Sequence, residues 1–554
     1  MGRRKAAPEN APKIILDIFS LSPILSAMQN QNTAEMVRKA RIESLINRLN
    51  QDLFEKEKAI RLTLLTALGG ESIFLLGPPG VAKSMIARRL KYAFANAKSF
   101  EYLMGKFSTP DEVFGPVSIS KLKNEDKYER LTDKYLPGAN IVFLDEIWKA
   151  SPPIQNALLT VLNEKIYRNG EQEFKVDLRG LISASNELPL KGEGLEALWD
   201  RFLVRLIVGN IDKETLFEKL IALSGDANYE DIVDEELKIT GQEYEEWQKA
   251  IGKVKIPPHI LGLINYLRVK IKKRNVKAGP EEQMYVSDRR WKKIAHLLRT
   301  SAFFNDRDEV DMMDSFLIAD CIWDQDNQIS EAKEMTYSAI QSQGYNRLVN
   351  LSPIRNELES ILEEVIKETQ IIEKETVRQM KVYRDNMEND YVRIKNFWGE
   401  NSDAFARVED LEKVNPEKIA YVPIFELAGK IFRPFQTYGV MRKEEFVLFN
   451  NQRELGIETE EVEKEKIIPK KPSIEMVRVW NSQIQILIES CEQFLAKVEK
   501  QKDKDQQYLH NNLFVEKELA AYAKAGMEST SNDIVALKLE IQKAQHSYES
   551  IKES

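Results

Sequence analysis

A short segment rich in glycine and proline ends in a lysine and a serine: Gly77-Pro78-Pro79-Gly80-Val81-Ala82-Lys83-Ser84. It directly follows the apolar run Ile73–Leu76, which predicts a strand, and directly precedes a stretch that predicts a helix. A tight turn between a strand and a helix points successive backbone N–H groups and the positive helix end at one spot. All eight residues are therefore candidates for binding the phosphates of a nucleotide.

Two side chains of this segment add chemistry that the backbone lacks. Lys83 supplies a mobile cation for the β- and γ-phosphates, and the Ser84 hydroxyl can bind Mg²⁺. Ala82 stands where the usual phosphate-loop pattern has its second glycine, so the backbone there must be one that an L-residue can adopt. The alternative, a Gly/Pro turn with a chance lysine, is disfavoured by the strand before it and the helix after it. We expect ATP and Mg²⁺ as the ligands.

Two carboxylates follow another apolar run, Ile141–Leu144, which predicts a central buried strand. Ligands of open α/β sheets bind at the carboxyl ends of the strands, where Asp145 and Glu146 would emerge. Asp145 is expected to support Mg²⁺ through its water shell, and Glu146 to accept the proton of an attacking water. Alone, such a run is more often a strand that meets solvent. Its position behind the phosphate loop favours the catalytic interpretation.

One amide and four arginines complete the set of candidates. Asn186 ends the next predicted strand and can hold the water between Glu146 and the γ-phosphate. Either Arg201 or Arg205 can reach the γ-phosphate held by a neighbouring subunit, as an arginine finger does. For each of these two, a salt bridge with Asp200 or Glu196 is the alternative.

A further arginine is expected at the start of a later helix. Ser287 is a good N-cap residue and is followed by Asp288, Arg289 and Arg290. One of these two arginines can fold onto the nucleotide. We choose Arg289, with Arg290 left open.

Alternating strands and helices up to about Asp212 predict an α/β class with a parallel sheet covered on both faces, followed by a helical lid. Further strands are expected at Phe100–Met104, Leu181–Ala184 and Val204–Val208, and one helix from about Thr33 to Leu68. The expected divisions are an N-terminal extension (1–34), the α/β core (35–212), the lid (213–330), long helices (331–404), a small compact strand-rich domain (405–470) and C-terminal helices (471–554).

The C-terminal half shows helical apolar stripes on either side of a different kind of segment. One stripe begins at Ile354 and predicts a long charged helix lasting to about Trp398. A second, Trp480–Val498, is close to a heptad pattern. Between them, Asn415–Asn451 has prolines, glycines and short apolar runs that indicate strands, and Glu458–Lys471 is interpreted as a linker.

Bulk composition excludes some classes of protein. A net charge of −8 gives the chain as a whole no reason to coat nucleic acid or an anionic membrane. The apolar stretch Ile14–Met28 is interrupted by Asp17 and Pro23, so we expect no signal peptide, no membrane span and a cytoplasmic location. Cys321 and Cys491 each lie in an apolar helical pattern and are expected to be buried thiols.

Taken together, these residues resemble the MoxR branch of AAA+ ATPases, and within it the regulatory ATPase variant A (RavA) subfamily. The resemblance rests on the motifs Gly77–Ser84 with its alanine, Phe107–Gly115, Phe143–Trp148, Pro152–Leu159, Ala184–Pro189 and Asp200–Phe202. It is specific from about Glu35 to Gln328 and looser afterwards. It implies a Walker A lysine, a Walker B pair, a sensor 1 asparagine, a finger arginine and a sensor 2 arginine at Lys83, Asp145 with Glu146, Asn186, Arg201 and Arg289, respectively.

The resemblance also implies partners. It implies a homohexameric ring with chaperone-like remodelling activity, a partner with a von Willebrand factor A domain, and a lysine decarboxylase or other client bound through residues 405–470. Two other functions stay open. One is a nucleic-acid motor that grips phosphate with a basic cluster, Arg268, Lys270, Lys272, Lys273, Arg274 and Lys277. The other is a non-hydrolysing scaffold that ATP assembles into a ring.

Overall fold

We analysed a computed structural model of the chain, which describes residues 38–190, 192, 194–222, 231–346, 348–399, 402–428, 431–450 and 453–553. The expected N-terminal extension, 1–34, and the apolar stretch Ile14–Met28 lie outside these residues. The chain divides into two compact units. Unit 1 is the described chain up to Pro353 together with Glu489–Lys538, and unit 2 is Ile354–Ile488 with the described residues from Leu539 onward.

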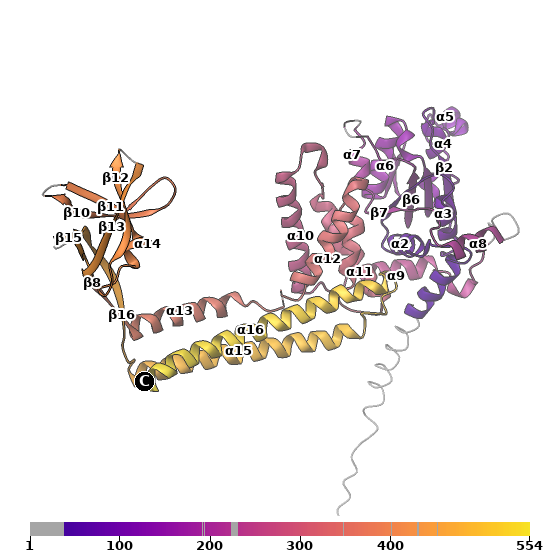
Figure 1. Cartoon of the computed structure of the whole chain (residues 1–554). Helices are drawn as coiled ribbons and strands as arrows, with labels where there is room; N and C mark the ends of the chain where they lie inside the picture. Colours follow the sequence, from indigo (N-terminus) through magenta and orange to yellow (C-terminus); the bar gives the residue numbers. More distant parts are fainter. Residues whose placement is uncertain are drawn as a thin grey trace, which may run out of the picture. The chain divides into compact units, whose positions relative to one another are not determined.

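Unit 1 is built around a five-stranded parallel sheet with the strand order β2-β3-β6-β1-β7. Figure 1 labels three of these strands, β2, β6 and β7. The strands are β1 (Ser72–Leu76), β2 (Ser99–Leu103), β3 (Ile141–Asp145), β6 (Gly180–Ser185) and β7 (Val204–Ile207). The inner strands are short apolar runs that are almost wholly buried, whereas the edge strand β2 alternates between buried and exposed residues. This pattern is typical of a parallel sheet with both faces covered, and all five expected strands are confirmed.

The α/β region also contains helices, the first two of which contact the sheet. They are α2 (Glu57–Leu68), α3 (Lys83–Lys91), α4 (Pro110–Phe114), α5 (Ile119–Glu125), α6 (Pro152–Glu164) and α7 (Glu196–Trp199), and a hairpin of β4 (Ile166–Asn169) and β5 (Gln172–Lys175) follows α6. The single helix expected from Thr33 to Leu68 is wrong. Its described part is a helix at 38–49 and a separate α2, because Asp52 and Glu55 between them take left-handed backbone angles.

The lid of unit 1 is helical, as expected. It contains α8 (Glu214–Ala222), α9 (Gly241–Ile251), α10 (Pro258–Lys277), α11 (Asp288–Phe304) and α12 (Ile329–Gln343). The Ser287 side chain accepts a hydrogen bond from the backbone N–H of Arg290, so the predicted N-cap of α11 is confirmed. Leu513 and Phe514, from the turn between α15 (Ile474–Gln506) and α16 (Ala520–Glu553), are buried in the core of the same unit.

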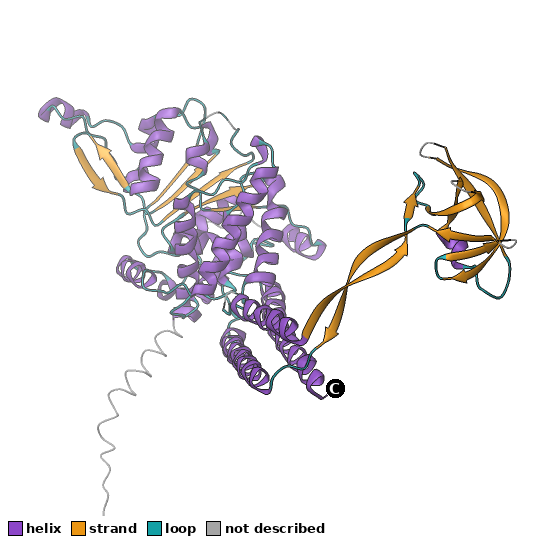
Figure 2. Cartoon of the chain, turned by 90° about the vertical axis from the view of Figure 1, so that its left-hand side faces the viewer, coloured by secondary structure: helices purple, strands orange, loops and turns teal. Residues whose placement is uncertain are grey.

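Unit 2 begins with α13 (Ser352–Thr369) and then departs from the sequence-based expectation. The helix expected to last to Trp398 is wrong, because residues after Thr369 form strands. The linker expected at Glu458–Lys471 is also wrong. Strand β8 (Gln370–Met380) pairs antiparallel with β16 (Thr459–Pro469), and the two form a twisted two-stranded ribbon (Figure 2). The second predicted helical stripe is confirmed by α15.

Charge pairs between β8 and β16, two segments far apart in the sequence, help to explain why the ribbon forms. Opposite charges face each other in its register, with Lys374 opposite Glu465 and Glu373 opposite Lys466. Such cross-strand pairs favour a hairpin ladder. In sequence order, however, the same lysines and glutamates are also typical of a solvated helix, and this similarity misled the prediction.

Beyond the ribbon lies a module of seven antiparallel strands, six of which close on themselves. The strands of this module are β9 (Val382–Arg384), β10 (Asp390–Gly399), β11 (Ser402–Arg407), β12 (Ala420–Ala428), β13 (Ile431–Glu444), β14 (Val447–Asn450) and β15 (Arg453–Ile457), and a short helix α14 (Val408–Glu412) follows β11. Pairing runs from β10 through β11, β12, β13, β14 and β15 and back to β10, which makes a closed barrel. Its core is apolar and includes Val392, Ile424 and Leu448. A compact strand-rich region is confirmed, but it begins at Val382 rather than at residue 405, and its last expected residues form β16 of the ribbon.

Two smaller expectations can also be compared with the structure. Cys321 and Cys491 are free and buried, as predicted. Within the described residues, no helix combines the length and the apolar content that crossing a bilayer requires.

Candidate active site

The phosphate-loop segment lies between the end of β1 and the start of α3, where the sequence predicts it. Ala82 is the N-cap of α3 and has the left-handed backbone angles φ 70° and ψ 20°. Gly80 also has a positive φ, 85°. A Cβ built on Gly77 would overlap the backbone oxygen of Val208, so only glycine fits there. The loop therefore has a tightly wound backbone, and its alanine occupies a conformation that favours glycine.

Lys83, Asn186 and Glu146 form one hydrogen-bonded row. The Lys83 ammonium donates to the backbone oxygens of Gly77 and Pro78, at 2.6 and 2.9 Å, and to Oδ1 of Asn186 at 2.8 Å. Asn186 Nδ2 in turn donates to Oε1 of Glu146 at 2.9 Å. The row crosses the carboxyl ends of β1, β6 and β3, which are neighbours in the sheet. The structure thus brings together three candidates from separate segments of the chain, and Lys83 and Asn186 are 103 residues apart.

Asp145 and Ser84 lie beside this row. Asp145 is the last residue of β3, and burial raises the pKa of its carboxyl group. The backbone N–H of Glu146 donates to Asp145 Oδ1 at 3.0 Å. Ser84 is the second residue of α3, directly after Lys83. Burial lowers the pKa of Lys83, while the nearby charges of Asp145 and Glu146 raise it. The site is thus a partly buried cation facing two carboxylates.

Sequence reasoning missed two contacts of Glu146. Lys149 forms an ion pair with its carboxylate at 3.3 Å, and Ser185 Oγ lies 3.4 Å from Oε2. Lys149 follows Glu146 by three residues in a short 3-10 helix, η3 (Ile147–Lys149), and that spacing was a usable signal. Ser185 directly precedes Asn186 at the end of β6. Both contacts hold the Glu146 carboxylate at the carboxyl edge of the sheet.

Of the finger candidates, the structure contradicts Arg205. Its side chain on β7 is fully buried, pairs with Asp324 at 2.5 Å, and stacks over the ring of Trp199 at 3.7 Å. Burial, reinforced by the charge of Arg290, lowers the pKa of Arg205 to about 9, so the side chain stays protonated at neutral pH. A side chain enclosed in its own chain cannot reach a neighbouring subunit.

Arg201 is placed differently. Its side chain is 15% exposed and pairs with Asp200 at 3.3 Å, which is one of the salt bridges that the sequence left open. Burial lowers the pKa of Arg201, and the positive charge of Arg289 lowers it further. Arg201 and Arg289 are thus close enough to repel each other. Arg201 is therefore the finger candidate that remains.

The two lid arginines differ in exposure. Arg290 is buried and donates to the backbone oxygen of Phe202 at 2.7 Å. Arg289 is exposed and donates to Asn163 Oδ1 at 2.8 Å. Among the described residues, no hydrogen bond or ion pair joins Arg201 or Arg289 to Lys83 or Glu146. Arg289 is the one of the pair that is free to move toward a ligand.

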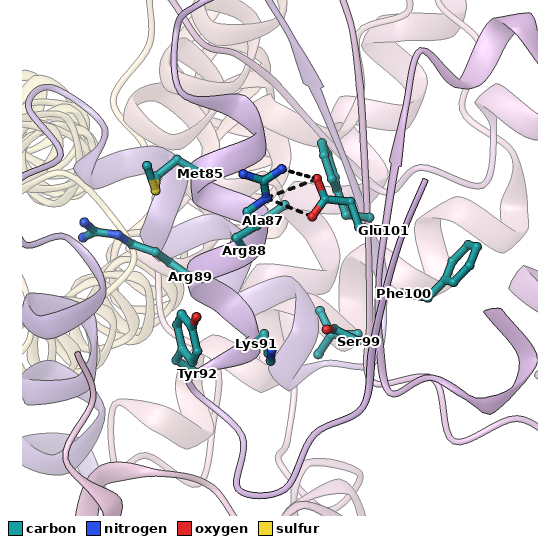
Figure 3. A pocket seen from close by; sticks show the side chains of 11 residues that line it. Met85, Ala87, Arg88, Arg89, Lys91, Tyr92, Ser99, Phe100 and Glu101 are labelled. Carbon is teal, nitrogen blue, oxygen red and sulfur yellow. Dashed lines mark hydrogen bonds and ion pairs between the residues drawn. The ribbon is translucent and has the colours of Figure 1, made fainter. Parts of the chain in front are cut away.

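A separate pocket of about 170 Å³ lies between α3 and β2 (Figure 3). Arg88 of α3 and Glu101 of β2 point toward each other across it and form an ion pair at 2.6 Å. Its lining includes none of the residues from Gly77 to Ser84. The pocket therefore belongs to the outer edge of the sheet rather than to the phosphate loop.

The basic cluster on α10 is partly engaged within the lid. Arg274 pairs with Glu331 at 2.9 Å, and the Lys270 ammonium donates to Ser338 Oγ at 3.1 Å. These contacts favour a structural and solvated role for this part of α10 over a nucleic-acid surface.

Comparisons with known proteins identify relatives of this chain. Residues 40–248 match a family described as the MoxR domain in MoxR-vWA-beta-propeller ternary systems, and residues 259–336 match an AAA lid domain. Two uncharacterized proteins of Methanocaldococcus jannaschii, MJ0079 and MJ0812, are 39% and 35% identical to this chain. These alignments cover 51% and 52% of this chain and 70% and 72% of the relatives.

A third relative is the chaperone MoxR1 of Mycobacterium tuberculosis. It is 27% identical over 30% of this chain and 44% of its own length. The two family matches lie within the part of the chain that carries the parallel sheet, the phosphate loop and the lid. This chain belongs to the MoxR family of AAA+ ATPases.

Proposed function

We propose that the chain binds ATP with Mg²⁺ at the phosphate loop, hydrolyses it with Glu146, and uses the energy to remodel partner proteins as a ring of identical chains. The observation that carries this proposal is the row Lys83–Asn186–Glu146. It sets a cation, an amide and a carboxylate in line across three adjacent strand ends. That is the order in which phosphate binding, water positioning and proton acceptance are needed.

The residues present fit a nucleoside triphosphate and a divalent cation. The loop wraps closely around the start of α3, where backbone N–H groups and the helix dipole favour an anion. Ser84 and Asp145 offer the hydroxyl and carboxylate oxygens that would hold Mg²⁺. When bound, Mg²⁺ neutralises charge on the phosphates and eases their displacement. A cation beside Asp145 also offsets the burial that raises the pKa of this carboxyl group.

Each remaining residue has a separate task. The Lys83 ammonium exchanges its bonds to Gly77 and Pro78 for phosphate oxygens. Asn186 orients a water between itself and the γ-phosphate, and Glu146 accepts the proton of that water on a carboxylate oxygen. Arg201 of one chain is assigned to the nucleotide of the next chain, and Arg289 to closure of the lid.

Family membership supports proposals about assembly and partners. A finger supplied by a neighbouring chain makes hydrolysis depend on ring formation, and we assign this chain to a homohexamer. The family description supports a partner with a von Willebrand factor A domain. The name of the relative MoxR1 supports chaperone-like activity. Binding of a lysine decarboxylase or another client through residues 405–470 stays a prediction.

The decisive experiment compares phosphate release by the wild type and by a Glu146→Gln variant. Removing the general base should lower the rate by about 10²–10⁴-fold, while binding of a fluorescent ATP analogue is retained. Glu171→Gln, an exposed change in the β4–β5 hairpin, is the matched control and should leave the rate unchanged. Equal rates for Glu146→Gln and the wild type would show that the assignment is wrong.

A second variant tests the binding step. Lys83→Ala should lose nucleotide affinity, because the loop then has no cation opposite the phosphates. If the wild type binds ATP but releases no phosphate, the chain is the non-hydrolysing scaffold instead.

A further inference from the structure

The helix α8, the first helix of the lid after β7, has no buried residue. It nevertheless has an apolar face made of Leu216, Phe217, Leu220 and Ile221. Phe217, Leu220 and Ile221 are 51%, 41% and 69% exposed. Residues spaced by one, four and five positions lie on one side of a helix. An apolar helix face of this kind is expected to be covered by another surface.

The start of α8 is nevertheless fixed. The carboxylate of Glu55 accepts hydrogen bonds from the backbone N–H groups of Asp212 and Lys213, at 2.7 and 3.1 Å. Val208, at the end of β7, donates its N–H to the oxygen of Leu76, directly before the phosphate loop. The apolar face is thus presented at a defined place, a few residues along the chain from the segment that packs on Gly77.

The charges on α8 favour a protein partner over a membrane surface. Helices that lie on anionic lipid carry lysine and arginine on their polar face. The polar residues of α8 are Glu214, Glu218 and Lys219, with Thr215 between them. Glu214 and Glu218 lie one turn apart beside the apolar face. A surface that is apolar and carries a basic side chain would be complementary to this helix.

This chain carries such a surface itself, on α5. Among the α-helices within the described ranges, only α5 and α8 have no buried residue. On α5, Ile119 is 79% and Leu122 is 45% exposed. Lys123, directly after Leu122, forms no ion pair with any described residue. The two uncovered helices are therefore matched in apolar character and opposite in charge.

We propose that α8 of one copy of the chain packs its apolar face against α5 of the next copy, with Glu218 facing Lys123. The proposal rests on the ring assembly proposed above and names the surface through which it forms. A contact between two different patches of the same chain repeats head to tail and closes into a ring when the rotation allows. It would also bring a neighbouring chain close to the phosphate loop.

Cross-linking tests the pairing directly. Cys321 and Cys491 are buried, so cysteines introduced at Glu218→Cys and Lys123→Cys would be the reactive thiols on the surface. A short bismaleimide, added with Mg²⁺ and a slowly hydrolysed ATP analogue, should link chains only when the two variants are mixed. Linking in Glu218→Cys alone would mean that α8 packs on another α8. That result, or no linking in the mixture, would overturn the proposal.

An assembly assay separates this proposal from the proposed function. Phe217→Glu should raise the protein concentration at half-assembly by about tenfold or more, as expected when an interface anchor is lost. Leu261→Glu, on α10 and 53% exposed, is the matched control and should assemble like the wild type. If the wild type and Phe217→Glu assemble equally well, the proposed α8–α5 contact is wrong, while the proposed ring assembly is retained. If the wild type stays monomeric with the nucleotide, the ring itself is wrong.

Discussion

The parallel sheet of unit 1 is an open sheet with two edge strands, whereas the barrel of unit 2 is a closed sheet without them. The parallel sheet is open, and the carboxyl ends of its inner strands carry Asp145, Glu146 and Asn186 side by side. The barrel closes β15 back onto β10, so its inner strands have partners on both sides. A closed barrel has no free edge and no crevice at a strand switch point.

The interiors of unit 1 and of the barrel also differ in the charged side chains that they bury. Unit 1 buries several charged side chains, among them Lys83, Arg205, Arg290 and Arg307. In the described residues of the barrel, no charged or amide side chain is buried. Burying charge is costly unless it is paired, and such groups concentrate at functional sites. The comparison therefore favours unit 1 over the barrel as the location of the chemistry proposed above.

Glycines offer the sharpest test of this difference. Gly77→Ala puts a Cβ against the Val208 oxygen, so the free energy of unfolding should fall by about 3 kcal/mol or more, and nucleotide binding should be lost. Gly456→Ala in the barrel meets nothing within 4 Å and should change stability by less than about 0.5 kcal/mol. Denaturant unfolding and nucleotide titration measure both. Equal losses of stability in Gly77→Ala and Gly456→Ala would contradict the proposed difference between unit 1 and the barrel.

Acid should remove the stabilising effect of one buried group of unit 1, His259. Burial lowers the pKa of His259 to about 4, from 6.5 in an unfolded chain, because its charged form is poorly solvated. As the pH falls, His259 therefore binds a proton in the unfolded state at a higher pH than in the folded state. The stabilising effect is complete above pH 6.5 and is lost as the pH falls toward 4, by about 2 kcal/mol at pH 5.

Scanning calorimetry between pH 8 and 5 measures this loss. His259→Phe keeps a ring against Tyr345 but cannot bind a proton, so it should remove much of the pH dependence of the first transition. A barrel transition that shifts by the same amount as that of unit 1 would contradict the comparison.

The phosphate loop should be slightly strained at its alanine. Ala82 has φ 70°, a conformation that costs an L-residue about 1 kcal/mol or more relative to glycine. Ala82→Gly should therefore raise the midpoint of thermal unfolding of unit 1 without loss of nucleotide binding. Ala139→Gly, at an ordinary extended φ of −100°, should lower it instead.

The ribbon should show the smallest effect. Lys374 and Glu463 form an ion pair at 3.1 Å, and both side chains are about two-thirds exposed. Exposed pairs contribute less than about 1 kcal/mol and are screened by salt. A double-mutant cycle with Lys374→Ala and Glu463→Ala should therefore give a coupling energy that vanishes in high salt. A larger coupling energy would mean that the ribbon is stabilised as strongly as a buried site.

Much of unit 1 was predictable because its signals are local. The run Ile141–Leu144, the loop before Lys83 and the cap at Ser287 each specify structure within a few residues. The placement of Asn186 next to Lys83 and Glu146 followed from the rule that parallel strands share a carboxyl edge. The roles assigned to these residues remain predictions.

What sequence reasoning missed depends on distant partners. Arg205 looked like a surface arginine, because its partner Asp324 lies more than one hundred residues further along the chain. The strand β8 looked helical, because the charges that pair with it belong to β16. In both cases the residue type was compatible with two structures, and only the tertiary partner distinguished them.

The base of the ribbon has a consequence for how this chain can be rebuilt. The backbone N–H of Lys470 donates to the oxygen of Thr369 at 2.7 Å, so entry to and exit from the intervening hundred residues lie side by side. A segment with adjoining ends behaves as a cassette. It can be exchanged for another small domain, or shortened to a tight turn, without a change in the positions of the flanking helices α13 and α15.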